Sequence, residues 1–221
     1  MRILHLAKSD LGGGAAKAAY RIHKSLNKYG VHSTMLVGEK LSTNSTVIGP
    51  TRFFEKEWSR RIAPFLDSLP LKLLHTSDHN YYSPAWISSP SFSKIQNLNP
   101  SLIHLHWICG GFLRPESLPL LDKIPILWRL PDMWAFSGAE HYVGESNRFK
   151  EGYYRENRPH QESGWDLNQW VWKRKLKAWR KLKNLTIITP SSWLSQCARE
   201  SVLLKNFRIE VIPTGHDLKI Y

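Results

Sequence analysis

Short apolar segments rich in β-branched residues alternate with longer segments of helical periodicity, and this alternation limits the possible folds more than any other feature. We expect strands at residues 2–7, 33–37, 102–106, 124–129, 185–189 and 209–212, and helices at 15–29, 166–183 and 191–204. Repeated alternation of strand and helix is typical of a parallel sheet covered by helices on both faces. The sequence therefore predicts an α/β protein with a Rossmann-like, doubly wound parallel sheet.

Two segments interrupt the alternation. Residues 51–74 have helical periodicity, but we expect Pro64 and Pro70 to break it. Residues 135–164 are polar and aromatic without a clean period, and an irregular segment of about 30 residues in a compact domain is usually functional or mobile. We expect residues 1–212 to form one domain and residues 213–221 to begin a linker.

The composition is that of a globular domain that needs no disulfides or structural metal for stability. The chain has 221 residues, of which 42% are hydrophobic and 22% charged. Its two cysteines, Cys109 and Cys197, form neither a disulfide framework nor a metal-binding pair. The N-terminal apolar run is too short for a signal peptide, and no stretch reaches the roughly 18 apolar residues that cross a bilayer. These features predict a cytoplasmic protein.

The net charge of +13 favours anionic partners, and part of it lies in one predicted helix. Trp165, Trp172, Leu176 and Trp179 recur there at helical spacing, with seven basic residues around them from Lys173 to Lys183. The pattern predicts a core-facing stripe under a solvated basic face, and it also allows peripheral contact with an anionic membrane. No nucleic-acid-binding motif accompanies the charge, so we expect no specific nucleic-acid partner.

A glycine turn, residues 12–14, joins the first expected strand to the first expected helix. Glycines let the backbone approach a ligand, and the N-terminus of a helix attracts phosphate. The turn is not a Walker A loop, and Lys17 occupies the place of the third glycine of a dinucleotide-binding fingerprint. Both phosphate contact and a purely structural turn fit the sequence.

Two histidines, His104 and His106, end the third expected strand. Their spacing places both on one face of the strand, near the carboxyl end where doubly wound sheets bind ligands. Because the sequence suggests no third ligand nearby, we expect no metal site. We expect His104, which lies deeper in the sheet, to be structural.

Polar and aromatic side chains crowd the loop after the fourth expected strand: Asp132, Trp134, Ser137, Glu140 and His141. Aromatic rings stack on sugars and carboxylates bind their hydroxyls, so the loop is typical of a carbohydrate pocket. A packed, hydrogen-bonded surface loop is the alternative.

Several blocks together resemble a bacterial branch of glycosyltransferase family 4, in the order found in that family. They are residues 2–6, 12–21, 104–112, 132–142, 189–194 and 211–217. The resemblance implies the N-terminal, acceptor-binding half of a GT-B fold, with residues 213–221 leading to a C-terminal donor-binding domain that is absent from the sequence. It also implies metal-independent, retaining transfer from a nucleotide-sugar co-substrate to a glycan or lipid-linked acceptor, in surface polysaccharide synthesis. No cofactor is implied beyond that co-substrate.

The resemblance also implies roles for individual residues. Gly13 and Gly14 would approach the donor diphosphate, His106 would be catalytic, and Gly215 and Asp217 would begin the interdomain connection. The residues expected to bind the acceptor are Trp107, Gly110, Gly111, Asp132, Trp134 and His141.

The sequence departs from the family at two places. Pro131 stands where relatives commonly have histidine, and the loop from Ala139 to Gly164 contains none of the cysteines that relatives often carry. An inactive remnant, a carbohydrate-binding module and a basic nucleic-acid-binding protein are therefore alternatives. A nicotinamide-dependent oxidoreductase is a further one, disfavoured by the imperfect glycine fingerprint.

Overall fold

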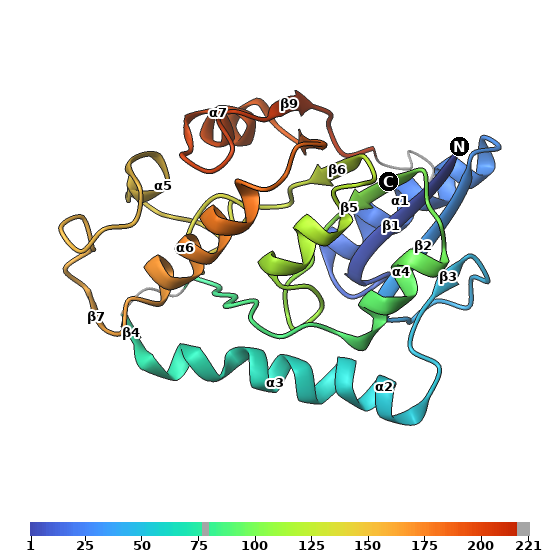
Figure 1. Cartoon of the computed structure of the whole chain (residues 1–221), viewed down its shortest axis with the longest axis horizontal. Helices are drawn as coiled ribbons and strands as arrows, with labels where there is room; N and C mark the ends of the chain where they lie inside the picture. The colour runs from blue at the N-terminus through green and yellow to red at the C-terminus, as the bar shows by residue number, and fades with distance from the viewer. Residues whose placement is uncertain (77–79, 216–221) are drawn as a thin grey trace.

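A seven-stranded parallel sheet forms the centre of the computed structural model, which describes residues 1–76 and 80–215 (Figure 1). The strands are β1 (Arg2–Ser9), β2 (His32–Glu39), β3 (Val47–Ile48), β5 (Leu102–Leu105), β6 (Ile126–Arg129), β8 (Leu185–Thr189) and β9 (Arg208–Val211). Their order across the sheet is β3-β2-β1-β5-β6-β8-β9. The predicted α/β class with a doubly wound parallel sheet is confirmed.

The direction of winding reverses between β1 and β5. The chain first builds outward from β1 through β2 to β3, and then from β5 through β6 and β8 to β9 on the other side. β1 and β5 pair directly, with His5 opposite His104. In open α/β sheets such a reversal opens a crevice at the carboxyl ends of the strands, which is where ligands bind.

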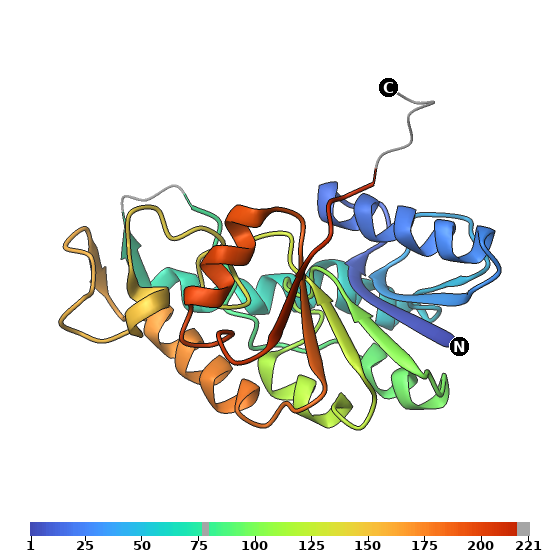
Figure 2. The ribbon, with the colours of Figure 1, turned by 90° about the horizontal axis from the view of Figure 1, so that it is seen from above.

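Helices cover both faces of the sheet. Figure 2 shows α1 (Gly14–Lys28) and α7 (Ser192–Glu200) on one face. On the other face lie α4 (Lys94–Asn97), the 3-10 helix η4 (Pro115–Leu121) and α6 (Leu167–Trp179). The observed bounds of α1 and α6 lie within a few residues of the expected ones, because the glycine turn and the Asp166 N-cap mark where these helices start.

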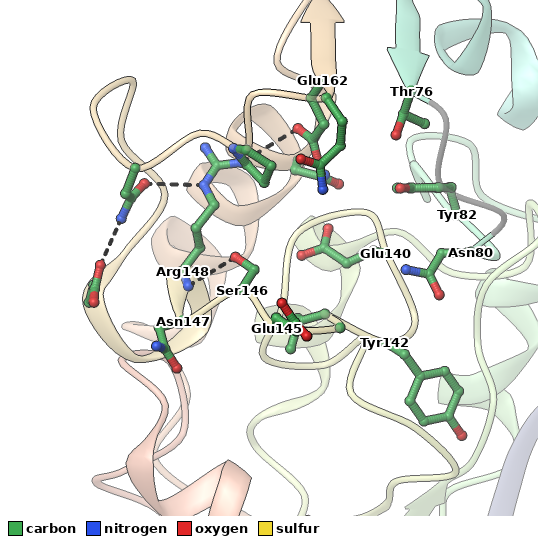
Figure 3. A pocket seen from close by; sticks show the side chains of 17 residues that line it. Thr76, Asn80, Tyr82, Glu140, Tyr142, Glu145, Ser146, Asn147, Arg148 and Glu162 are labelled. Atoms are coloured by element: carbon green, nitrogen blue, oxygen red, sulfur yellow. Dashed lines mark hydrogen bonds and ion pairs between the residues drawn. The ribbon is translucent and has the colours of Figure 1, made fainter.

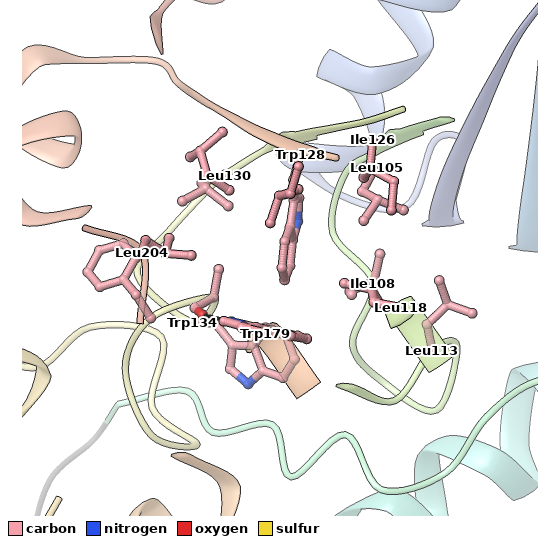
Figure 4. Packing of buried hydrophobic residues seen from close by; sticks show 14 of the residues in the cluster. Leu105, Ile108, Leu113, Leu118, Ile126, Trp128, Leu130, Trp134, Trp179 and Leu204 are labelled. Carbon is pink, nitrogen blue, oxygen red and sulfur yellow. Dashed lines mark hydrogen bonds between the residues drawn. The ribbon is translucent and has the colours of Figure 1, made fainter. Parts of the chain in front are cut away.

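The main core fills the space between the sheet and the helices η4 and α6. Trp128 of β6 lies at its centre, where its ring meets that of Trp179 edge to face at a centroid distance of 5.4 Å (Figure 4). Leu105 and Leu118 are fully buried in the same cluster. This packing explains part of the high tryptophan content, since a large aromatic ring removes much apolar surface from water.

The prolines of the segment 51–74 do not break it as expected. Helix α2 (Phe53–Glu57), the π-helical turn η1 (Trp58–Ile62), α3 (Ala63–Ser68) and the 3-10 helix η2 (Leu69–Leu73) follow one another without a gap. Pro64 and Pro70 are each the second residue of a segment of different helix type, α3 after the π-helical turn and the 3-10 helix η2 after α3. The prolines therefore coincide with changes in helix type and do not end the helical segment. The segment ends in β4 (Leu74–Thr76), which pairs antiparallel with β7 (Glu162–Gly164).

The loop 135–164 is better ordered than its sequence suggests. It contains the short helix α5 (Arg148–Glu151) and β7, and its buried side chains include Phe136, Phe149 and Tyr153. Aromatic anchors therefore hold it to the domain.

The expectation of a uniformly solvated basic face on α6 is wrong. Lys175 is fully buried, and its ammonium group donates hydrogen bonds to the carbonyl oxygens of Trp134 and Gly138. Trp172 and Trp179 are buried as the stripe predicts, but Trp165 is 40% exposed. Within residues 1–76 and 80–215, no helix is both long and apolar enough to cross a bilayer.

Candidate functional site

A pocket of about 330 Å³ opens at the carboxyl edge of the sheet, next to the reversal point between β1 and β5. We call it the glycine-turn pocket. Its walls come from the end of β1 and the start of α1, from Trp107, the second residue after β5, from Tyr81, and from the loop after β6. The lining residues are Ala7, Lys8, Ser9, Gly12, Gly14, Ala15, Ala16, Tyr81, Trp107, Asp132, His141 and Tyr142.

The N-terminus of α1 forms one wall of the pocket. Gly13 is the N-cap residue, with φ of 97°, a conformation that favours glycine, and the first turn of the helix carries no acidic side chain. The first N–H groups of any helix lack partners within it, and here those of Gly14, Ala15 and Ala16 belong to pocket-lining residues. This wall can therefore accept an anionic group such as a phosphate.

A buried hydrogen-bond network forms the opposite wall. His141 Nδ1 lies 2.7 Å from Asp132 Oδ2, and His141 Nε2 lies 2.9 Å from the hydroxyl of Ser83. Asp132 Oδ1 accepts a hydrogen bond from the backbone N–H of Trp134 at 2.9 Å. Since both nitrogens of His141 are engaged, this imidazole positions the wall, and the Asp132 carboxylate keeps lone pairs for a ligand hydroxyl.

Aromatic rings complete the pocket. The ring of Tyr81 lies 4.9 Å from that of His141 and 6.3 Å from that of Trp107, measured between centroids. Burial raises the pKa of Tyr81, so its hydroxyl stays protonated at neutral pH. A flat apolar surface beside a carboxylate is the combination that binds a sugar ring.

Two charged residues, Lys8 near the end of β1 and Asp10 just after it, shape the glycine turn. Lys8 lies at the pocket, and burial lowers its pKa while the carboxylates of Glu39 and Asp67 oppose that change. Asp10 is buried and accepts hydrogen bonds from the backbone N–H groups of Leu41 and Ser42. Asp10 thereby ties the turn to the segment after β2.

Figure 3 shows a second pocket of about 330 Å³. Tyr142 lines both this pocket and the glycine-turn pocket. The side chains of the second pocket are mostly polar and include Glu140, Arg148 and Glu162. The hydroxyl of Tyr153 donates a hydrogen bond to Glu140. Burial raises the pKa of both glutamates, and the nearby Glu140 adds to the effect on Glu162.

Several of the predicted site residues come together at the glycine-turn pocket. Trp107, Asp132, His141 and Gly14 line it, and Gly13 lies at its edge as the N-cap of α1. The glycine turn and the segments that follow β5 and β6 therefore open onto one edge of the sheet.

Three predicted acceptor residues lie outside this pocket. Trp134 is buried behind it, where its indole N–H donates to the carbonyl oxygen of Ser83 at 2.9 Å. Gly110 and Gly111 form a turn with positive φ, and a Cβ on Gly111 would lie 2.7 Å from the carbonyl carbon of Ala63. Packing and backbone conformation explain both glycines without a ligand.

The expectation that His106 faces the pocket is wrong. His106 is only 3% exposed, and its Nε2 lies 2.9 Å from Nδ1 of His5 on the neighbouring strand. The backbone N–H of His106 donates a hydrogen bond to the carbonyl oxygen of Leu6, so the pairing with β1 continues through this residue. The imidazole therefore points to the same buried face of the sheet as that of His104, and not into the pocket. Of the predicted interdomain pair, Gly215 is exposed and Asp217 lies outside the described residues.

Sequence reasoning missed the residues that support the site. Tyr81 and Tyr142 carry no local motif, since only the tertiary fold brings residues 81 and 142 beside residue 107. Lys175 lies among the basic residues of α6 that the helical pattern predicts to face solvent. His5 lies in an ordinary apolar strand pattern, yet it pairs with His104.

A comparison with models of known protein families finds no match, and no curated protein matches the chain. The relation to glycosyltransferase family 4 stays a prediction, carried by the motifs and by the placement of their residues around the glycine-turn pocket.

Proposed function

We propose that this chain forms the acceptor-binding side of a glycosyltransferase that moves a sugar from a nucleotide-sugar donor to a glycan or lipid-linked acceptor. The observation that carries the proposal is the glycine-turn pocket, where the N-terminus of α1 faces aromatic rings and the Asp132 carboxylate. The N-terminus of the helix suits the diphosphate of a donor, and the aromatic rings and the carboxylate suit a sugar ring.

In this proposal the residues of the pocket bind and orient the substrates. The N–H groups at the start of α1 would hold negative charge that develops on the leaving diphosphate. Asp132 would accept a hydrogen bond from an acceptor hydroxyl, and Trp107 and Tyr81 would pack against the sugar ring. A separate donor-binding half would hold the nucleotide, so we expect this chain alone to bind nucleotide sugars weakly.

Binding and transfer measurements test the proposal. Nuclear magnetic resonance titration with a panel of monosaccharides should shift the signals of the pocket residues. Asp132→Asn should weaken that binding by about tenfold, the value of one lost charge-assisted hydrogen bond. Glu156→Gln, an exposed change away from the pocket, is the matched control. Calorimetry with UDP- and GDP-sugars should give no tight saturable binding, and low-micromolar affinity would contradict the assignment of halves.

Transfer itself requires a donor-binding half. The chain should be supplied with that half of a family 4 enzyme, together with labelled nucleotide sugars and a membrane fraction that contains acceptors. Labelled product that disappears with Asp132→Asn supports a transferase. Sugar binding without any transfer would favour the second candidate, a carbohydrate-binding module, which Pro131 and the buried His106 also favour.

The acceptor side of such an enzyme would work near a membrane if its acceptor is lipid-linked. Five exposed basic residues in and after α6 support a peripheral contact with anionic lipid: Lys173, Lys177, Arg180, Lys181 and Lys183.

A further inference from the structure

Three buried histidines meet beneath the glycine-turn pocket. His5 comes from β1, His104 from β5 and His106 from the position just after β5, and all three point to the face of the sheet covered by α1. One nitrogen of each imidazole lies within 4.8 Å of a nitrogen of each of the other two. We propose that these three side chains bind a divalent transition-metal ion of the zinc type.

The backbone fixes the relative positions of the three imidazoles. His5 and His104 are direct partners in the parallel pair β1–β5, and His106 follows two residues later on the same face. The ring centroids of His104 and His106 are 4.3 Å apart, and His5 Nδ1 lies 2.9 Å from His106 Nε2. Zinc–nitrogen bonds of about 2.0–2.1 Å in a tetrahedral site separate ligand atoms by about 3.4 Å. The ring nitrogens, which lie within 4.8 Å of one another, would have to reach this separation, and bonds to the metal would replace the His5–His106 hydrogen bond.

Unsatisfied polar atoms point to a missing partner. Among the described residues, Nε2 of His5 and Nε2 of His104 have no hydrogen-bond partner, although both side chains are more than nine-tenths buried. A buried polar atom without a partner is costly. His23 on α1 makes the contrast clear, because its nitrogens lie 2.8 Å from the hydroxyls of Ser33 and Thr46. Among the buried histidines that the structure describes, only those of this cluster have ring nitrogens without a partner.

The protonation state and the type of the three ligands define which metals fit. Burial lowers the pKa of all three imidazoles, that of His104 to about 4, so no proton has to leave before a metal binds at neutral pH. The guanidinium of Arg129 is the nearby cation and opposes a second positive charge. An all-imidazole set suits zinc, copper, nickel or iron and does not suit magnesium or calcium, which prefer oxygen ligands.

The ion would bridge β1 and β5 at the reversal point of the sheet. β1 continues from His5 into Lys8 and Ser9, and β5 continues from His106 into Trp107, so both walls of the glycine-turn pocket extend from the proposed site. Binding would couple these walls and stiffen the floor of the pocket. This role does not depend on glycosyl transfer.

Metal titration of the intact, chelator-treated chain tests the proposal. We expect one equivalent of Co²⁺ to give visible d–d absorption, which Zn²⁺ displaces, and we expect Zn²⁺ to raise the melting temperature. Loss of a residue that only hydrogen-bonds a metal ligand lowers metal affinity by about 10–100-fold. His104 is proposed as a ligand itself, so His104→Gln should lower the affinity by more than about 100-fold. His23→Gln and the exposed His160→Gln should keep wild-type affinity.

Absence of stoichiometric Co²⁺ binding would overturn the proposal, as would binding that survives His104→Gln and disappears with His160→Gln. Circular dichroism without metal shows whether each variant is folded. Should His104→Gln fail to fold, imidazole ¹⁵N spectra of the wild type give the answer: Zn²⁺ must shift the signals of three buried histidines. Shifts confined to exposed histidines reject the site.

Discussion

Asp132 and His141 lie nine residues apart in the chain, and their side chains meet at 2.7 Å. The hydrogen bond closes the loop after β6 into a compact unit, since the N–H of Met133 also donates to the carbonyl oxygen of His141 at 3.0 Å. Removing the imidazole therefore disturbs the scaffold of the pocket as well as its surface.

His141→Ala should lower the free energy of unfolding by about 2–4 kcal/mol, because it removes a buried ring and its hydrogen bonds to Asp132 and Ser83. Tyr142→Ala, which truncates an exposed ring of the same pocket, should change stability by less than about 0.5 kcal/mol and still weaken sugar binding. Urea unfolding and monosaccharide titration of both variants separate the two effects. Equal losses of stability would show that Tyr142 is also structural.

Gly13 and Gly14 should respond differently to alanine. Gly13 has φ of 97°, so Gly13→Ala should cost about 1–2 kcal/mol in backbone strain. Gly14 is the first residue of α1, and a Cβ there meets nothing within 4 Å. Gly14→Ala should therefore be neutral or stabilising by up to about 1 kcal/mol. Thermal unfolding compares them, and a larger loss at Gly14 would refute the assignment of Gly13 as the constrained position.

Lys175 should make stability depend on alkaline pH. Burial lowers its pKa to about 7 from an ordinary 10.5, although the charge of Glu140 opposes this. Between these values the unfolded chain carries a proton that the folded protein does not, so stability rises with pH, by at most about 1.4 kcal/mol per pH unit. Urea unfolding at pH 7, 8 and 9 should show this rise in the wild type relative to Lys175→Met.

Lys173→Met provides the control for that experiment, because Lys173 lies on the same helix and is exposed. Its stability should stay parallel to that of the wild type across the series. If the stability of the wild type changes with pH in the same way as that of Lys175→Met, then Lys175 keeps its proton from pH 7 to pH 9.

Charge reversal in α6 and the residues after it tests the membrane contact. Lys177→Glu combined with Lys181→Glu should reduce binding to vesicles with anionic lipid, since each basic residue near such a surface contributes about 1 kcal/mol. The same change at Lys24 and Lys28, exposed on α1, should have a smaller effect. Co-sedimentation measures both. Equal losses would indicate attraction by net charge alone.

The sequence predicts the sheet well because its strands are buried on both faces. Such strands read as short apolar runs, so Leu185–Thr189 is found with its expected bounds and β1 only two residues longer than expected. The two-residue strand β3 and the pair β4–β7 are too short to leave a periodic pattern.

The site is only partly predictable, since its chemistry depends on contacts between distant segments. Asp132 and His141 stand in one recognisable loop, so sequence reasoning selects them. The burial of His106 depends on its contact with His5, which is 101 residues away. The burial of Lys175 is equally unpredictable from the sequence, because its hydrogen-bond partners are backbone carbonyl groups, which leave no side-chain pattern.

The position of β1 inside the sheet has a consequence for how the protein is made. Its β2 edge can pair once residue 39 has been added, but its other edge waits for β5, which begins at residue 102. Ribosomes add about 5–20 residues per second, so this edge stays unpaired for about 3–13 s after β2 is complete. An unpaired strand edge is a template for wrong partners. The nascent chain is therefore most vulnerable to misassembly while the segment between β2 and β5 is being synthesised.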